Sequence, residues 1–190
     1  GDNVTFDLNG SGVPSVNLTG PLSPRAVVVN AASDYTFTTS VGGGIVGSTG
    51  LTKSGAGTLV LDTDNSYTGP TLIQGGIVQL GAAGAQGSFG TGPVTNSAAI
   101  VVNRTGTVSF NNNLAGAGSL TNLLAGGIIS ISGANTLSGP IVLNAGGALS
   151  LDHSDATLRR VAIVGTVTGL RGGGLVTRNG AIPKLFNCIV

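Results

Sequence analysis

Charged residues are scarce in this sequence, and glutamate, methionine and tryptophan are absent from it. Only 8% of the 190 residues are charged, against roughly 25% in an average soluble domain. Helical surfaces are built largely from Glu, Lys, Arg and Ala, and this chain has only Lys53 and Lys184 as lysines. The shortage excludes a protein made of amphipathic helices and indicates an all-β chain.

Several other classes are excluded by what is missing. The hydrophobic fraction of 41%, the mean hydropathy of +0.41 and the net charge of +1 do not fit a disordered chain, which combines low hydrophobicity with high net charge. No uninterrupted apolar run approaches the roughly 20 residues of a membrane helix. Cys188 is the only cysteine, so no internal disulfide forms. The first residues resemble no signal peptide, and we expect either a removed leader or a fragment of a longer protein.

Short apolar alternations recur along the chain and are separated by clusters of Gly, Asn, Asp, Ser and Pro. This period of two predicts strands of three to five residues, and the gaps are too short for the crossover helices of a βαβ fold. The alternating pairs include Val27/Val29, Tyr35/Phe37, Leu59/Leu61, Val78/Leu80, Ile100/Val102, Val108/Phe110, Ile129/Ile131, Ile141/Leu143 and Leu149/Leu151.

An internal repeat selects among the all-β folds. At an offset of 70 residues, Gly57 aligns with Gly127, Asn65 with Asn135 and Pro70 with Pro140, and apolar positions align with apolar ones. Such a repeat is typical of a solenoid, and a content of 4% aromatics favours a narrow aliphatic core. We therefore predict a single-stranded right-handed parallel β-helix (β-solenoid) of about seven or eight coils of 20–30 residues, in which Asn side chains adopt left-handed geometry and form amide ladders between coils.

Two stretches of the sequence resemble the autotransporter-associated, or passenger-associated, β-strand repeat family. The signature of that family begins with Leu-Thr-Lys-x-Gly-x-Gly-Thr-Leu-x-Leu, which residues 51–61 match as LTKSGAGTLVL, and continues with Asn-x-Tyr-x-Gly-x-Thr-x-Ile, which residues 65–73 match as NSYTGPTLI. The best match is 51–80. A copy over 120–151 is degenerate, because Asn122 replaces the lysine and Leu137 replaces Tyr67.

The resemblance implies a fragment of a bacterial exported passenger that is secreted or displayed outside the outer membrane. It implies a structural scaffold that assists export and forms a rigid stalk, with the export machinery or membrane barrel outside this chain, which itself does not span the membrane. An adhesive role is open as well, through Thr, Asn and Tyr exposed along one solenoid face, with surface polysaccharide or host matrix as partner.

The last 39 residues do not follow the pattern. Residues 1–151 hold five Asp and three basic residues, whereas residues 152–190 hold two Asp and five basic residues. We therefore divide the chain into a β-solenoid over 1–151 and an atypical tail over 152–190, which is truncated or poorly ordered. This division fails if the tail continues the stack of coils with buried aliphatic side chains.

No residue pattern indicates a catalytic, cofactor-binding or metal site, and we expect neither a cofactor nor a nucleic-acid partner. His153 has Asp152 and Asp155 beside it in sequence, but a hydrolase triad requires convergence in space. The segment Asp62-Thr63-Asp64-Asn65 lacks the glycine and the closing glutamate of an EF-hand. The glycines of residues 169–174 follow no βα unit, and the arginines of the tail lack interleaved aromatics.

The alternative to a scaffold is a polysaccharide-active β-helix enzyme, a lyase or a hydrolase. Such sites gather carboxylates and basic residues on one face around a sugar. Between Leu8 and Leu151 the charged residues are scattered, so we expect no enzyme. Two carboxylates roughly 5–9.5 Å apart in a groove would favour the alternative.

Overall fold

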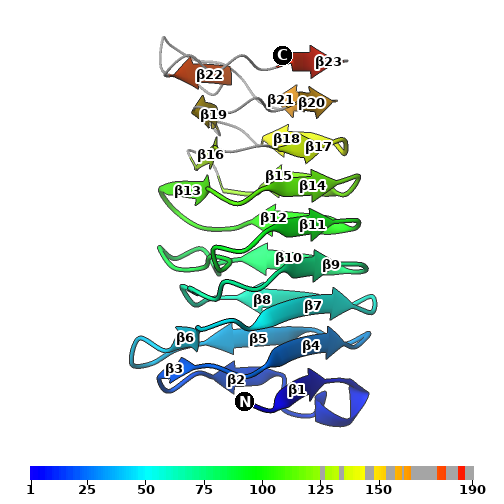
Figure 1. Cartoon of the computed structure of the whole chain (residues 1–190), viewed down its shortest axis with the longest axis vertical. Coiled ribbons are helices and arrows are strands. Elements are labelled where there is room, and N and C mark those ends of the chain that lie inside the picture. The colour runs from blue at the N-terminus through cyan, green and yellow to red at the C-terminus, as the bar shows by residue number, and fades with distance from the viewer. Residues whose placement is uncertain are drawn as a thin grey trace.

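The predicted strands form and stack into a parallel β-solenoid, seen in a computed structural model of the chain (Figure 1). The structure describes residues 1–124, 127–132, 135–143 and 148–150 in full, and backbone alone for residues 151–152 and the later strands. The chain climbs from the N terminus at one end of a rod to β23 at the other. The predicted all-β solenoid is confirmed.

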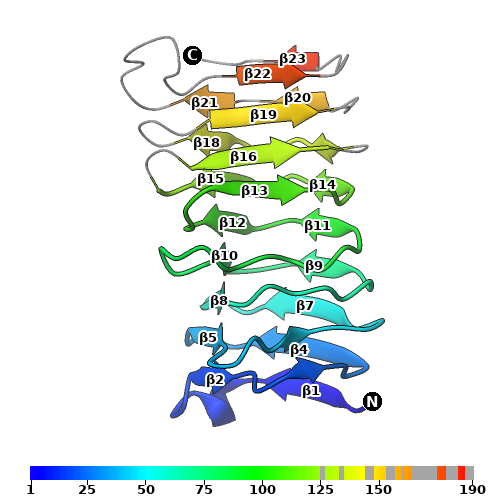
Figure 2. The ribbon, with the colours of Figure 1, turned by 90° about the vertical axis from the view of Figure 1, so that its left-hand side faces the viewer.

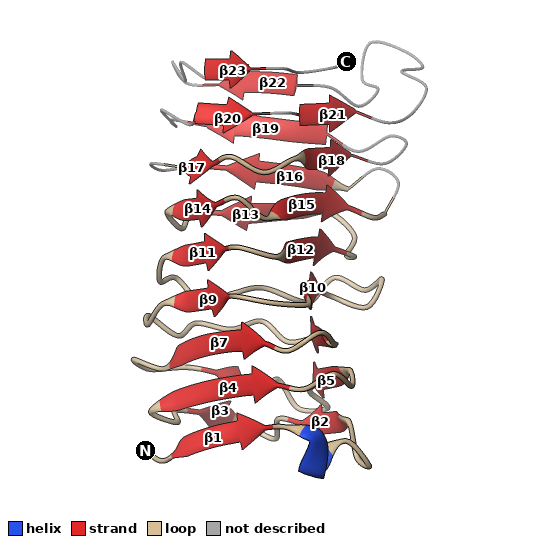
Figure 3. Cartoon of the chain, turned by 90° about the vertical axis from the view of Figure 1, so that its right-hand side faces the viewer, coloured by secondary structure: helices blue, strands red, loops and turns tan. Residues whose placement is uncertain are grey.

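Each coil contributes one strand to each of two long sheets, which we call the first and second faces (Figures 2 and 3). The seven-stranded first face contains β1 (Asn3–Phe6), β4 (Ala26–Asn30), β7 (Gly50–Ser54), β9 (Thr71–Ile73), β11 (Val94–Asn96), β14 (Leu114–Gly116) and β17 (Thr136–Leu137). The eight-stranded second face contains β2 (Ser15–Asn17), β5 (Tyr35–Thr38), β8 (Thr58–Leu61), β10 (Ile77–Leu80), β12 (Ala99–Val102), β15 (Ser119–Asn122), β18 (Ile141–Leu143) and β21 (Val161–Ile163).

The third face is the part of each coil that runs from the second face back to the first. It has strands at its two ends, which are β3 (Pro21–Leu22) and β6 (Gly44–Ile45), then β13 (Thr107–Phe110), β16 (Ile128–Ile131), β19 (Ala148–Asp152) and β22 (Leu175–Arg178). The coils that begin at β7 and β9 have no strand there. We number the coils by their first-face strands, so that β7 begins coil 3 and β9 begins coil 4.

The register shows the true length of a coil. Val27 pairs with Leu51, Leu51 with Thr71 and Thr71 with Val94, so one turn takes about 20 to 24 residues. The offset of 70 residues is therefore not a whole number of turns. It aligns Leu59 of β8 on the second face with Ile129 of β16 on the third face, and the two copies are rotated by one face relative to each other.

The core is a narrow column of inward side chains, as the alternation predicts. Leu59, Leu61, Val78, Leu80 and Ile100 are each 0% exposed. Strands with one inward aliphatic side chain at every second position stack in register, so each coil buries the core of the previous one. Phe6 closes the lower end against the rings of Tyr35 and Phe37, beside the 3₁₀ turn η1 (Leu8–Gly10).

Strands within the tail also pair in parallel with those of preceding coils. β19 pairs with β22, β18 pairs with β21, and β20 (Thr157–Arg159) pairs with β23 (Lys184–Phe186). The side chains from residue 151 onward lie outside the described residues, so the burial of aliphatic side chains in the tail is untested. The division of the chain at Asp152 stays a prediction.

Candidate functional site

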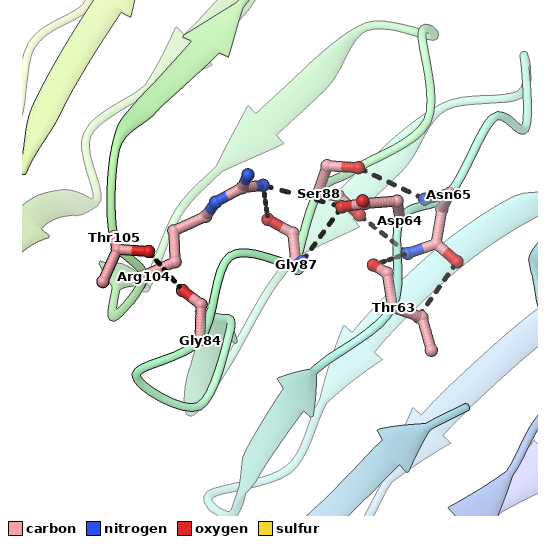
Figure 4. A network of polar contacts seen from close by, with 8 residues as sticks. All are labelled: Thr63, Asp64, Asn65, Gly84, Gly87, Ser88, Arg104 and Thr105. Carbon is pink, nitrogen blue, oxygen red and sulfur yellow. Dashed lines mark hydrogen bonds and ion pairs between the residues drawn. The ribbon is translucent and has the colours of Figure 1, made fainter. Parts of the chain in front are cut away.

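Side-chain hydrogen bonds take the place of strand pairing where the third face of coils 3 and 4 has no strand. Asn65 is the central residue (Figure 4). Its Oδ1 accepts a hydrogen bond from the Ile45 backbone N–H in coil 2 at 2.9 Å, and its Nδ2 donates to the Ser88 carbonyl in coil 4 at 2.7 Å. Nδ2 also donates to the Thr63 carbonyl of its own coil at 3.0 Å. One amide thus links three successive coils.

The charged pair beside Asn65 extends this network to coil 5 (Figure 4). Asp64 Oδ1 accepts a hydrogen bond from the Gly87 N–H at 3.0 Å and lies 3.6 Å from Arg104 Nη1. The same Nη1 donates to the Gly87 carbonyl at 2.9 Å. Because the Asp64 side chain is 59% exposed, the ion pair itself contributes little. The bonds to the Gly87 backbone instead hold the loop of residues 81–87 against coils 3 and 5.

Lys53 is the second clamp and lies inside the solenoid. It occupies an inward position of β7 and is 0% exposed. Its ammonium group donates to the carbonyls of Ser54 and Gly55, both at 2.8 Å, and to that of Gly75 in coil 4 at 3.2 Å. Burial lowers the pKa of Lys53, and the negative charge of Asp34 partly offsets this effect. The bonds tie the turn after β7 to the same turn one coil above.

Tyr67 is buried under the third face and is 0% exposed. Its hydroxyl shares a 2.7 Å hydrogen bond with the Thr71 hydroxyl at the start of the next coil. Burial raises the pKa of Tyr67 to about 12, and the hydrogen bond to Thr71 opposes this rise. Tyr67 and Tyr35 are both buried, so the prediction that tyrosine is exposed on an adhesive face is wrong.

The predicted asparagine geometry is also wrong, although the importance of these residues is not. Among the described residues, the non-glycine residue with positive φ is Ala83, so no described asparagine is left-handed. The amide of Asn65 binds backbone groups of the adjacent coils, not another amide. Asn135 acts in the same way, because its Oδ1 accepts the Leu114 N–H of the preceding coil at 2.8 Å. The aligned asparagines therefore keep one local role on two different faces.

Other residues considered in the sequence lie apart from a shared pocket. Asp34 accepts a hydrogen bond from the Thr58 N–H, which engages this carboxylate in the backbone. His153, Asp155 and residues 169–174 lie outside the described residues, as do the side chains of Asp152 and the tail arginines. Within the described part, no group of three or more His, Cys, Asp or Glu side chains is placed to hold a metal ion. No described helix is long and apolar enough to cross a membrane.

One cavity of about 180 Å³ lies on the third face between coils 4 and 5. Leu80, Phe89, Val108 and Phe110 form its apolar lining, and Ser88, Thr91, Ser109 and Asn111 are among its polar lining residues. No ionisable side chain lines it. The cavity is small for a ligand site and brings together none of the carboxylates that a sugar-cleaving enzyme needs.

Comparison with known proteins agrees with the residues that form the clamps. Residues 51–80 match the family model of the passenger-associated-transport-repeat. Over 85 residues the chain is 35% identical to the adhesin BmaC autotransporter of Brucella suis biovar 1 (strain 1330), an alignment that covers 45% of this chain and 2% of that protein. No solved structure matches. The matched family segment contains Lys53, Asn65 and Tyr67, and the chain is an autotransporter passenger-repeat protein.

Proposed function

We propose that this chain is a rigid scaffold segment of an exported bacterial passenger and that it acts mechanically, without catalysis. The observation that carries the proposal is the bridging of coils 2, 3 and 4 by Asn65, inside the matched repeat. A solenoid whose stability comes from contacts between neighbouring coils can fold coil upon coil. We propose that such stepwise folding assists export, followed by secretion or display on the cell surface.

The described charged residues support a structural role. Asp34 and Asp64 both accept backbone N–H groups, and Asp64 pairs with Arg104. Lys53 is satisfied by three carbonyls. General acid–base catalysis requires groups that are free to exchange protons with a substrate, and these groups are engaged with the protein backbone. A relative that is named an adhesin makes adhesion a natural extension of the stalk role, with polysaccharide or host matrix as the partner class.

The test is made in the complete exported protein with Asn65→Ala as the variant. If coil folding assists export, the variant lowers the amount displayed or secreted, at unchanged transcript level. Asn113→Ala is the control, since the Asn113 side chain is exposed and its loss leaves the clamps intact. Equal export of wild type and both variants, with the Asn65 variant shown to be destabilised, would contradict the export role.

A further inference from the structure

The outward side chains of the first face form one column along the solenoid axis. Successive partners in the register alternate between threonine and an aliphatic residue, in the order Thr5, Val28, Thr52, Leu72, Thr95, Ala115 and Thr136. The seven strands that carry them lie one above another in Figure 3. Threonine thus recurs at every second coil over the whole described first face.

The threonines of this column are available to a ligand. Thr5, Thr95 and Thr136 are exposed and Thr52 is half-buried. Within the described residues none of the four hydroxyls has an intramolecular hydrogen-bond partner, whereas Thr71 at an inward position is bonded to Tyr67. Because threonine is β-branched, its χ1 angle is restricted, and hydroxyls held by a rigid sheet lose little freedom when a ligand binds.

The face is also free of charge. Lys53 is the one charged residue in the strands of the described first face, and its side chain is inward and fully buried. A charged polymer would lose solvation at this surface without gaining an opposite charge. Neighbouring strands lie about 4.7–4.9 Å apart, so the threonines recur at about 9.4–9.8 Å. The partner that fits is uncharged, extended and periodic.

We propose that the threonine column of the first face binds an extended, neutral, β-1,4-linked polysaccharide that lies along the solenoid axis. In such a chain successive sugar rings are flipped, so equivalent hydroxyls recur at every second ring and face the threonines. The apolar C–H faces of the rings lie over Val28, Leu72 and Ala115. A peptide fits less well, because the backbone groups within a sheet face are already paired. This inference rests on the proposed scaffold role and names the ligand class of an adhesive stalk.

The second face supplies a matched control. Its outward column also alternates, in the order Thr36, Val60, Gln79, Val101, Thr121 and Val142. One of its polar groups is already occupied, since the Gln79 amide donates to the Gly81 carbonyl at 2.8 Å. The paired variants are therefore Thr52→Val with Thr95→Val on the first face, and Thr36→Val with Thr121→Val on the second. Both pairs remove two hydroxyls and keep the side-chain shape.

The experiment measures binding of the full chain to cellohexaose by calorimetry and to swollen cellulose by sedimentation, with amylose and a polyuronate as comparison polymers. The wild type is expected to bind the neutral β-1,4-linked glucans, the first-face variant to lose at least tenfold in affinity, and the second-face variant to bind like the wild type. Absence of wild-type binding, equal loss in both variants, or equal binding of amylose or polyuronate would overturn the proposal. So would activity on ice growth without glucan binding, because the column would then order water.

Small-angle scattering on the same samples separates this inference from the proposed function. A rod-shaped wild type that binds no glucan refutes the ligand assignment and leaves the scaffold intact. A chain that is not a rod refutes the scaffold itself. Far-UV circular dichroism of both variants confirms that a loss of binding comes from the hydroxyls and not from a loss of fold.

Discussion

Asn65→Ala is expected to destabilise the solenoid strongly, because one side chain satisfies backbone groups in three coils. The substitution removes the acceptor of the Ile45 N–H and the donor to the carbonyls of Thr63 and Ser88. A buried polar group left without a partner costs about 1–3 kcal/mol. Ser88 is half-buried, so water relieves part of the cost at its carbonyl. The expected loss is about 3 kcal/mol, high for a single substitution.

Asn65→Asp separates the acceptor from the donor. The introduced carboxylate still accepts from the Ile45 N–H, but it faces the carbonyls of Thr63 and Ser88 and cannot donate to them. Only its protonated form can donate, so its folded-state pKa is raised above the unfolded value. The stability of this variant is therefore highest below the unfolded pKa and is lost as the pH rises through the raised folded pKa.

The assay is urea unfolding followed by circular dichroism at several pH values, with amide exchange of Ile45 as a local probe. Exchange is included because solenoids open locally as well as globally. Asn113→Ala is the control, and it is expected to stay within about 0.5 kcal/mol of wild type because that side chain is exposed. A loss below about 1 kcal/mol for Asn65→Ala, or a pH-independent Asn65→Asp, would refute the reasoning.

Three further substitutions test the surroundings of the clamps by the same unfolding assay. Gly90→Ala is expected to cost about 2–3 kcal/mol, because the added methyl meets the carbonyl and ring of Tyr67, whereas Gly84→Ala is nearly neutral because a methyl there meets nothing within 4 Å. Lys53→Met is expected to destabilise, and the wild-type advantage grows as the pH rises towards 10.5, because the folded chain with its lowered Lys53 pKa loses the proton first; an advantage that shrinks contradicts this. Tyr67→Phe is expected to cost about 1 kcal/mol for the lost bond to Thr71. The wild-type advantage over this variant falls between pH 10 and about 12, because the raised pKa keeps the folded phenol protonated after the unfolded one ionises; a constant difference speaks against burial as the cause.

The inward positions of the solenoid were predictable because strands announce themselves locally. Leu59 and Leu61, like Val78 and Leu80, alternate in sequence and are fully buried in the structure. The length of a coil was not predictable from the repeat, because each face of the solenoid asks for the same pattern of alternating apolar residues. Self-similarity at an offset of 70 therefore joins a second-face strand to a third-face strand, and a rotation by one face looks like a full turn.

The clamp residues were only partly predictable, since their partners are backbone groups of other coils. Lys53 stands two residues after Leu51, at an inward position of the alternation, and this spacing was the available signal for a buried lysine. Nothing in the sequence gives its acceptors, which include the Gly75 carbonyl 22 residues away. Tyr67 has no alternating neighbours, because the third face has no strand in coil 3, and its burial follows from the coil above.

The absence of strands on the third face of coils 3 and 4 also explains why residues 51–80 match a family model and the copy at 120–151 is degenerate. Where strands pair, as β16 does with β13 and β19, backbone groups make the bonds, and alternating apolar residues of many kinds meet the requirement. Where strands are missing, particular side chains must make them, and Lys53, Asn65 and Tyr67 cannot be exchanged freely. The signature therefore marks the coils that are closed by side chains, and coils closed by strands are free to diverge while the rod continues through both.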